Sequence, residues 1–121
     1  DDTPASDRQA LMWVAMCRYY ALVGEFANEV LRERYLMGFS TLTKDDYDRF
    51  IQAQSMWHPE LEELSALTAG KLRSNVFKAM NEAELWEKES DTLLPSLLSK
   101  SVTAILENRP ESFRFFPTRE R

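Results

Sequence analysis

Residues 67–94 read LTAGKLRSNVFKAMNEAELWEKESDTLL, and this stretch decides the fold. Apolar side chains recur at spacings of three and four over residues 68–84, which predicts an amphipathic helix. The buried face of that helix is expected to consist of Leu72, Val76, Met80 and Ala83, with Phe77 beside it. The residues that follow are polar and lack a helical period, so a loop or a short β hairpin with Asp91 and Thr92 at its tip is predicted.

Two further helices are predicted ahead of this stretch. Thr43 occupies an N-cap position before an apolar stripe, and Pro59 is well placed to open a short helix. The three helices are expected to span residues 43–55, 60–64 and 68–84. Three helices followed by a hairpin give the order of a winged helix-turn-helix, in which the third helix lies in a DNA groove and the hairpin touches the DNA backbone. Residues 43–94 are therefore expected to form a winged-helix-like segment.

The region before this segment is also predicted to be helical. Apolar side chains recur at helical spacing over residues 7–35, which predicts one long helix or two collinear helices that meet near Gly24. Ser6 followed by Asp7 is expected to cap its start.

After the hairpin, residues 95–121 are expected to form a last helix, opened by Pro95, and a tail. The tail is expected to be a short strand or an extended segment that docks its aromatic rings on the core. Those rings belong to Phe113, Phe115 and Phe116. The residues expected to anchor the core are Trp13, Trp57 and Trp86. Residues 1–121 are thus expected to form one compact, mainly α domain with winged helix-turn-helix character and at most a short β hairpin.

Composition limits the class of protein. The chain has 121 residues, 44% of them hydrophobic, which is enough to bury a core. It has only 3 Gly and 5 Pro, too few for a many-turned β sandwich or a Gly-rich binding loop. No apolar run is long enough to span a membrane, and the acidic start is unlike a signal peptide, so a cytoplasmic protein is expected. Because there is no initiator Met, we expect a fragment of a longer protein.

No motif of an enzyme, a metal site or a cofactor site is found. The single cysteine, Cys17, lies in a helical apolar pattern and is expected to be a buried structural thiol in a reducing compartment. The only histidine, His58, has no companion at metal-ligand spacing. Clustered acids at helix starts are expected to be partners of the helix dipole. We therefore expect a protein without catalytic activity, bound metal or cofactor.

Positive charge is concentrated in one segment, although the net charge is −5. Residues 65–81 contain Lys71, Arg73 and Lys78 and no acid. Lysines neutralise phosphate, asparagine can pair with adenine, and the start of a helix suits a phosphate. The expected nucleic-acid-binding residues are Lys71, Ser74, Asn75 and Lys78 on one side of the helix, Arg73 at its margin, Thr68 at its start, and Lys88 and Lys100 flanking them on the hairpin and last helix.

Other interpretations of the same pattern stay open. A lysine-bearing outer face is common on amphipathic helices and can simply be solvated. In a protein–protein adaptor, the acidic helices 7–35 and 43–55 would dock a basic partner, with the aromatic residues of the tail exposed as an anchor. An RNA-binding helical bundle is a third interpretation.

Three segments resemble the C-terminal part of the BrxA family of bacteriophage-exclusion (BREX) defence systems. They are LVGEFANEVLRERYLMG, LTKDDYDRFIQAQSMWHPELEELSALTAGKLRSNVFKAMNEAELWE and LLPSLLSKSVTAILE, and together they cover about residues 22–107. The resemblance implies a largely helical fold with winged-helix character and a non-enzymatic accessory factor that binds double-stranded DNA, alongside other proteins of the defence system. Members of the family usually carry a further N-terminal helical region, which again implies a fragment.

Overall fold

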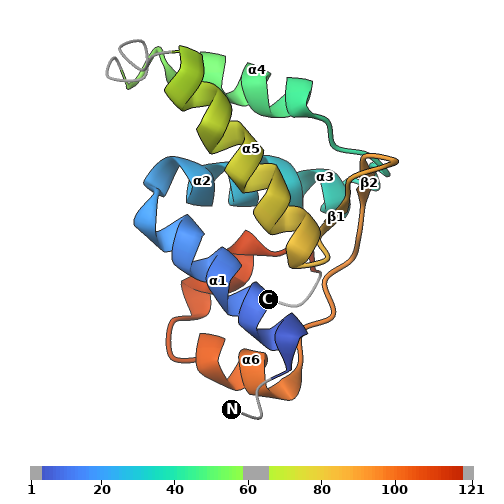
Figure 1. Cartoon of the computed structure of the whole chain (residues 1–121). Helices are drawn as coiled ribbons and strands as arrows, with labels where there is room; N and C mark the ends of the chain where they lie inside the picture. Colours follow the sequence, from blue (N-terminus) through green and yellow to red (C-terminus); the bar gives the residue numbers. More distant parts are fainter. Residues whose placement is uncertain (1–3, 59–65, 119–121) are drawn as a thin grey trace.

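The computed structural model describes residues 4–58 and 66–118, and it is mainly helical with one two-stranded hairpin (Figure 1). This confirms the expected mainly α fold class. The residues predicted to form a short helix at 60–64 lie outside the described residues. The elements are α1 (Ala5–Tyr19), α2 (Ala21–Phe26), a π-helical segment η1 (Ala27–Arg32), α3 (Glu33–Leu36), α4 (Lys44–Gln54), α5 (Ala66–Glu82), β1 (Trp86–Glu87), β2 (Thr92–Leu93), α6 (Lys100–Leu106) and a 3-10 helix η3 (Pro110–Phe115).

The N-terminal helical region bends at Tyr20, so the prediction of one helix, or two collinear ones meeting near Gly24, is wrong. Tyr20 has an extended backbone (φ −106°, ψ 102°), and α2 sets off from there in a different direction from α1 (Figure 1). Gly24 instead permits close packing, because a Cβ built there would lie 2.8 Å from the carbonyl oxygen of Cys17. The glycine therefore allows α1 and α2 to fold against each other at the bend.

The expected cap at Ser6 and Asp7 is also wrong. The helix α1 begins at Ala5, Pro4 stands at the N-cap position, and no side chain caps the helix. Ser6 and Asp7 belong to its first turn, where an acidic side chain interacts favourably with the helix dipole.

The predicted cap of α4 is confirmed. The Thr43 hydroxyl accepts a hydrogen bond from the backbone N–H of Asp46, and the Asp46 carboxylate accepts one from the backbone N–H of Thr43 at 2.8 Å. The same carboxylate forms ion pairs with Arg34, at 3.0 Å, and with Arg49. Burial alone would raise the pKa of Asp46, but the hydrogen bonds from Thr43 and Arg49 and the charge of Arg34 hold it below its ordinary value. Asp46 thus ties α3 to the start of α4.

We expect Asp46→Asn to lower the free energy of unfolding at pH 7 by about 1 kcal/mol, because the amide cannot pair with the two arginines. A carboxylate with a lowered folded-state pKa contributes stability that is present above its unfolded pKa of about 3.9 and is lost as pH falls through the folded value. Thermal melts of both proteins should therefore differ at pH 7 and converge at a pH below the folded-state pKa of Asp46. An equal difference at both pH values would contradict this assignment.

The part of the core where α2, α4 and α5 meet is rich in aromatic rings. Val76, Phe77 and Met80 are buried on α5, as predicted for that helix, whereas Leu72 and Ala83 are half-buried. The Phe26 ring of α2 lies 5.0, 5.8 and 6.3 Å, between centroids, from the rings of Tyr47, Phe50 and Phe77 respectively. Such edge-on and tilted contacts stabilise a core beyond the burial of area alone.

The hairpin is attached to the segment before α4. Trp86 pairs with Leu93 and Glu87 with Thr92, so Thr92 lies in the strand and not at the tip. A further bridge joins Thr41 to Thr92, and the Trp86 indole N–H donates to the Leu42 carbonyl oxygen at 2.7 Å. After α3, the described chain therefore forms a one-residue strand at Thr41, then α4, α5 and the hairpin.

Some predictions for the C-terminal part need correction. Pro95 does not open the last helix, because α6 begins at Lys100 after Ser99, whose hydroxyl accepts from the backbone N–H of Val102. The tail forms the 3-10 helix η3 and not a strand. Its Phe113 and Phe116 are buried and Phe115 is half-buried, so the expected docking of these rings on the core is confirmed. The exposed aromatic anchor of the adaptor interpretation is wrong. The aromatic tail instead completes the core.

Two hydrogen bonds show why the tail packs inward. The Trp13 indole N–H donates to the Phe115 carbonyl oxygen at 2.8 Å, and the Arg18 guanidinium donates to the Ser112 hydroxyl at 2.7 Å. Trp13 and Trp86 are buried core anchors as predicted, whereas Trp57 is 77% exposed, which corrects the third anchor. Trp57 follows the end of α4, where no described element covers it.

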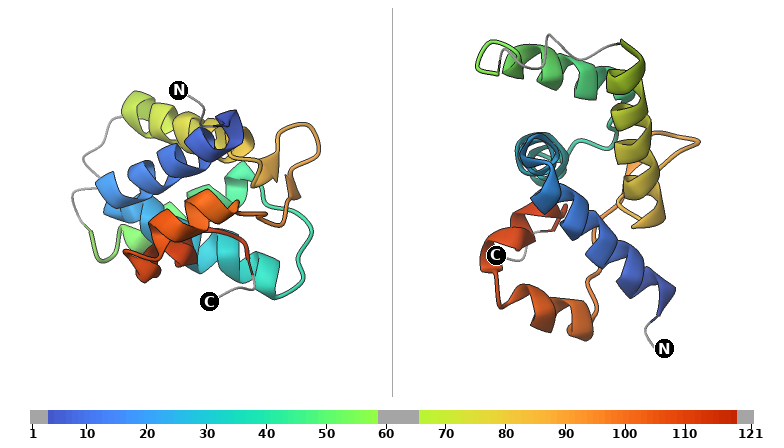
Figure 2. Two further views of the ribbon diagram at one scale, coloured as in Figure 1. Left: turned by 90° about the horizontal axis from the view of Figure 1, so that it is seen from below. Right: turned by 60° about the vertical axis from the view of Figure 1, so that its left-hand side comes forward.

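The helices α1 and α5 lie side by side, and α4 crosses one end of α5 (Figure 2). Among residues 4–58 and 66–118 we find no helix with the length and hydropathy needed to span a membrane.

Candidate nucleic-acid interface

The outward face of α5 carries most of the predicted binding residues. The inward face of this helix carries Val76 and Met80, which are buried in the core. The residues on its outward face, which recur at helical spacing, therefore lie in solvent. The exposed residues of this face are Thr68, Lys71, Ser74, Asn75 and Lys78. The structure thus places these five predicted residues together on one accessible helix face.

Arg73 differs from the other predicted residues. Its side chain is 35% exposed, and its Nη1 forms an ion pair with the Asp48 carboxylate of α4 at 2.8 Å. Its Nε is buried and has no hydrogen-bond partner among the described residues. Because a carboxylate neutralises the guanidinium, Arg73 contributes to the packing of α4 on α5 and adds little free positive charge to the face.

Lysines from three elements meet in one groove. The groove, which we call the lysine groove, runs between the start of α4, the side of α5 and the hairpin. It is lined by Lys44, Ser74, Lys78, Asn81, Glu82 and Lys88, among others. The Lys88 backbone N–H donates to the Asn81 side-chain oxygen at 3.2 Å, which fixes the hairpin against α5. The structure therefore brings the predicted Lys88 next to Lys78.

Lys44 was not among the residues predicted from sequence. It is the first residue of α4, where a cation interacts unfavourably with the helix dipole. In the sequence, a lysine at this unfavourable position was a weak signal that Lys44 serves binding and not the stability of the helix. In the part of the chain that the structure describes, neither Lys44, Lys71, Lys78 nor Lys88 forms an ion pair. Glu82 is the one carboxylate of the named groove residues, so three lysines outnumber it there.

Lys100 is not brought to this surface. It is the first residue of α6, and α6 packs on α1 and η3 at the end of the molecule away from α4 (Figure 1). The prediction that Lys100 flanks the α5 face is therefore not supported by its position.

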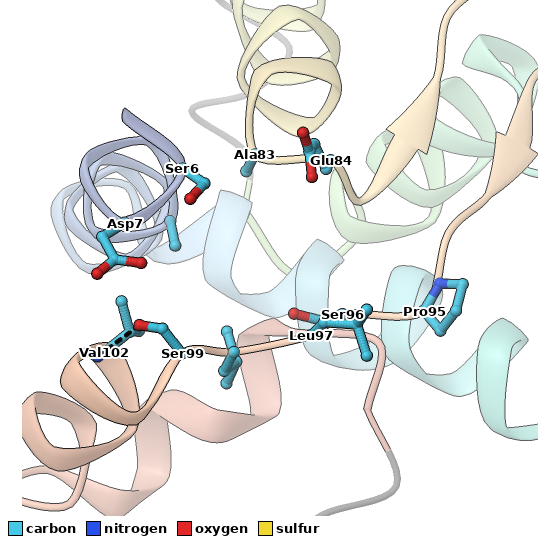
Figure 3. Close-up of a pocket in the computed structure, with 11 residues that line it drawn as sticks. Ser6, Asp7, Ala83, Glu84, Pro95, Ser96, Leu97, Ser99 and Val102 are labelled. Atoms are coloured by element: carbon cyan, nitrogen blue, oxygen red, sulfur yellow. Dashed lines mark hydrogen bonds between the residues drawn. The ribbon is translucent and has the colours of Figure 1, made fainter. Parts of the chain in front are cut away.

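A second, smaller cavity lies near α6, between the start of α1 and the end of α5 (Figure 3). Asp7, Glu84 and Ser99 are among the residues that line it, and Asp7 lies over the start of α6. A carboxylate near a helix start is stabilised by the backbone N–H groups there, which accounts for the burial of Asp7. This cavity contains none of the lysines of the α5 face.

Cys17 is buried in the core, as predicted, and burial raises the pKa of its thiol far above the ordinary value. A thiol that stays protonated at neutral pH is a poor nucleophile and a poor metal ligand. Its environment therefore matches that of a structural residue.

The chain was compared with known families, curated proteins and solved structures. A family model described as BrxA matches residues 2–109, which is most of the chain. No curated protein and no solved structure matches it.

Proposed function

This chain belongs to the BrxA family, a component of bacteriophage-exclusion (BREX) defence systems, and we propose that it is a non-enzymatic accessory factor that binds double-stranded DNA. The observation that carries the proposal is the lysine groove beside the exposed face of α5. Lys44, Lys78 and Lys88 come from three separate elements and converge there without an ion pair among the described residues. Convergent, unpaired cations on a protein of net charge −5 are suited to a polyanion.

The order of elements supports the same proposal. A helix, a one-residue strand, α4, α5 and a hairpin follow one another, and Thr41 pairs with Thr92 of the hairpin. This order is that of a winged helix-turn-helix, with α5 in the place of the recognition helix and the hairpin as the wing. In that interpretation Lys88 is the wing residue that contacts phosphate.

The neighbouring helix α1 limits how the duplex is bound. The major groove of B-DNA is about 12 Å wide and a helix with its side chains is about 10–12 Å across, so the groove admits one helix. Because α1 lies alongside α5 (Figure 2), α5 cannot insert deeply from that side. We infer that the protein approaches from the hairpin side and makes chiefly phosphate contacts, with little preference for sequence.

The salt dependence of binding tests this proposal. If Lys44, Lys78 and Lys88 each neutralise one phosphate, a plot of log affinity against log salt should have a slope of about −2.7. Fluorescence anisotropy with a labelled duplex at about 50–200 mM salt measures this slope. Unlabelled structured RNA should compete less well than the unlabelled duplex. A slope near zero, or stronger competition by the RNA, would contradict a duplex-binding role.

A further inference from the structure

An apolar groove runs along α5 where that helix faces α1, next to the lysine groove. We call it the tyrosine groove. It is lined, among others, by Met12, Tyr19, Tyr20, Lys71, Leu72 and Asn75. Tyr19 is 80% exposed, Met12 65% and Tyr20 43%, so large apolar groups face solvent here. Exposed apolar surface gathered in a groove marks a binding site more often than single exposed residues do.

Tyr19 and Tyr20 are neighbours at the bend between α1 and α2. Tyr19 is the last residue of α1, and Tyr20 is the extended residue at which the chain turns into α2. Their rings pack edge to face, with centroids 4.7 Å apart and planes at 83°. Each ring supports the other, and the bend beneath them is fixed by the close packing of Gly24 on Cys17. The two rings therefore form one aromatic surface beside the bend.

The wall opposite the tyrosines is polar and cationic. Lys71 and Asn75 of α5 line one section of the groove, and no carboxylate is found among the described lining residues of that section. Glu82 lines the neighbouring section, together with Lys78. Asparagine offers both a donor and an acceptor to the edge of a planar group, and lysine attracts a phosphate. An aromatic surface, an amide and a cation within one groove suit the face of a base, the edge of that base and a phosphate.

We propose that the tyrosine groove binds an unpaired base of single-stranded DNA, stacked on Tyr19 with its phosphate at Lys71. Positively charged grooves with aromatic side chains are the general means by which proteins bind single strands. Lys78 and Glu82 line both this groove and the lysine groove, so a duplex there and an unpaired base here would lie next to each other along α5. The proposal adds a second ligand to the proposed function and does not need the lysine groove.

The test uses a labelled single-stranded oligonucleotide of about 12 thymidines, a length within the site sizes of single-strand binders. Stacking of one base contributes roughly 5- to 150-fold to affinity. We expect Tyr19→Ala to weaken binding about 10-fold, and Tyr19→Phe, which keeps the ring, to retain affinity within about 2-fold of the parent. Trp57→Ala, which removes another highly exposed aromatic residue from outside the groove, is the matched control and should change nothing.

Each outcome decides the proposal. Because the Tyr19 side chain is exposed, Tyr19→Ala should melt at the parent's temperature, so a loss of affinity reports on binding. Unchanged affinity of Tyr19→Ala, equal losses in the Phe and Ala variants, or an equal loss with Trp57→Ala would overturn it. Tighter binding of an oligouridine RNA would overturn the assignment to DNA. If the parent binds the thymidine strand but not a duplex, the proposed function fails while this proposal stands.

Discussion

Replacing Lys44, Lys78 and Lys88 together with alanine is expected to weaken binding of duplex DNA on the order of 100-fold at about 0.1 M salt. The three side chains converge on the lysine groove from α4, α5 and the hairpin. A charge-assisted contact with phosphate is worth about 1 kcal/mol or more at an exposed site, so three lost contacts amount to about 3 kcal/mol. The slope of log affinity against log salt should also become less steep by about 2.7, or 0.9 for each phosphate released.

The matched control for this variant is Lys100→Ala. It removes one exposed lysine from α6, away from α4, and should change affinity by less than about 2-fold. All three lysines of the groove are exposed, so the triple variant should melt at the temperature of the parent. A folded triple variant that binds duplex DNA as tightly as the parent, with the same salt slope, would remove the basis of the proposed function.

The largest effect on stability is expected for Phe26→Ala. Phe26 is fully buried, and its ring contacts the rings of Tyr47 and Phe50 on α4 and of Phe77 on α5. Truncation of a buried phenylalanine removes transfer free energy and leaves a cavity, which together cost about 3–5 kcal/mol. For a chain of about 120 residues this corresponds to a fall in Tm of roughly 12–20 °C.

Thermal unfolding followed by circular dichroism measures this difference. Phe26→Leu, which fills much of the same volume, should lose less than half as much as Phe26→Ala. Leu97→Ala is the control for an apolar residue outside the core, because Leu97 is 94% exposed, and its Tm should stay within about 2 °C of the parent. A loss below about 1 kcal/mol in Phe26→Ala would show that the aromatic cluster is not central to the core.

Patterns within a few residues of one another predicted much of this molecule correctly. The spacing of Val76 and Met80 predicted the buried face of α5, and the spacing of Lys71, Ser74 and Lys78 predicted its exposed face. Thr43 predicted the start of α4, because a capping box involves a residue and the backbone three positions later. Such features depend on one helical turn, so the linear order of residues is enough to specify them.

Contacts between distant segments could not be predicted in this way. The ion pair of Arg73 with Asp48 joins two helices, and the hydrogen bond from Trp13 to Phe115 spans 102 residues. Lys44 and Lys88 reach the same groove as Lys78 only because the hairpin and the start of α4 pack on the same side of α5.

Helical periodicity and the cap of α4 could therefore be predicted from the order of the amino acids, and with them the fold class and the cationic face of α5. The packing of the helices against each other decides the rest. It determines which charges on that face stay unpaired, which aromatic rings are buried, and where the first helix bends. The reason is physical: helix periodicity comes from backbone hydrogen bonds between residues four apart, whereas burial and ion pairing come from shape and charge complementarity across the whole core.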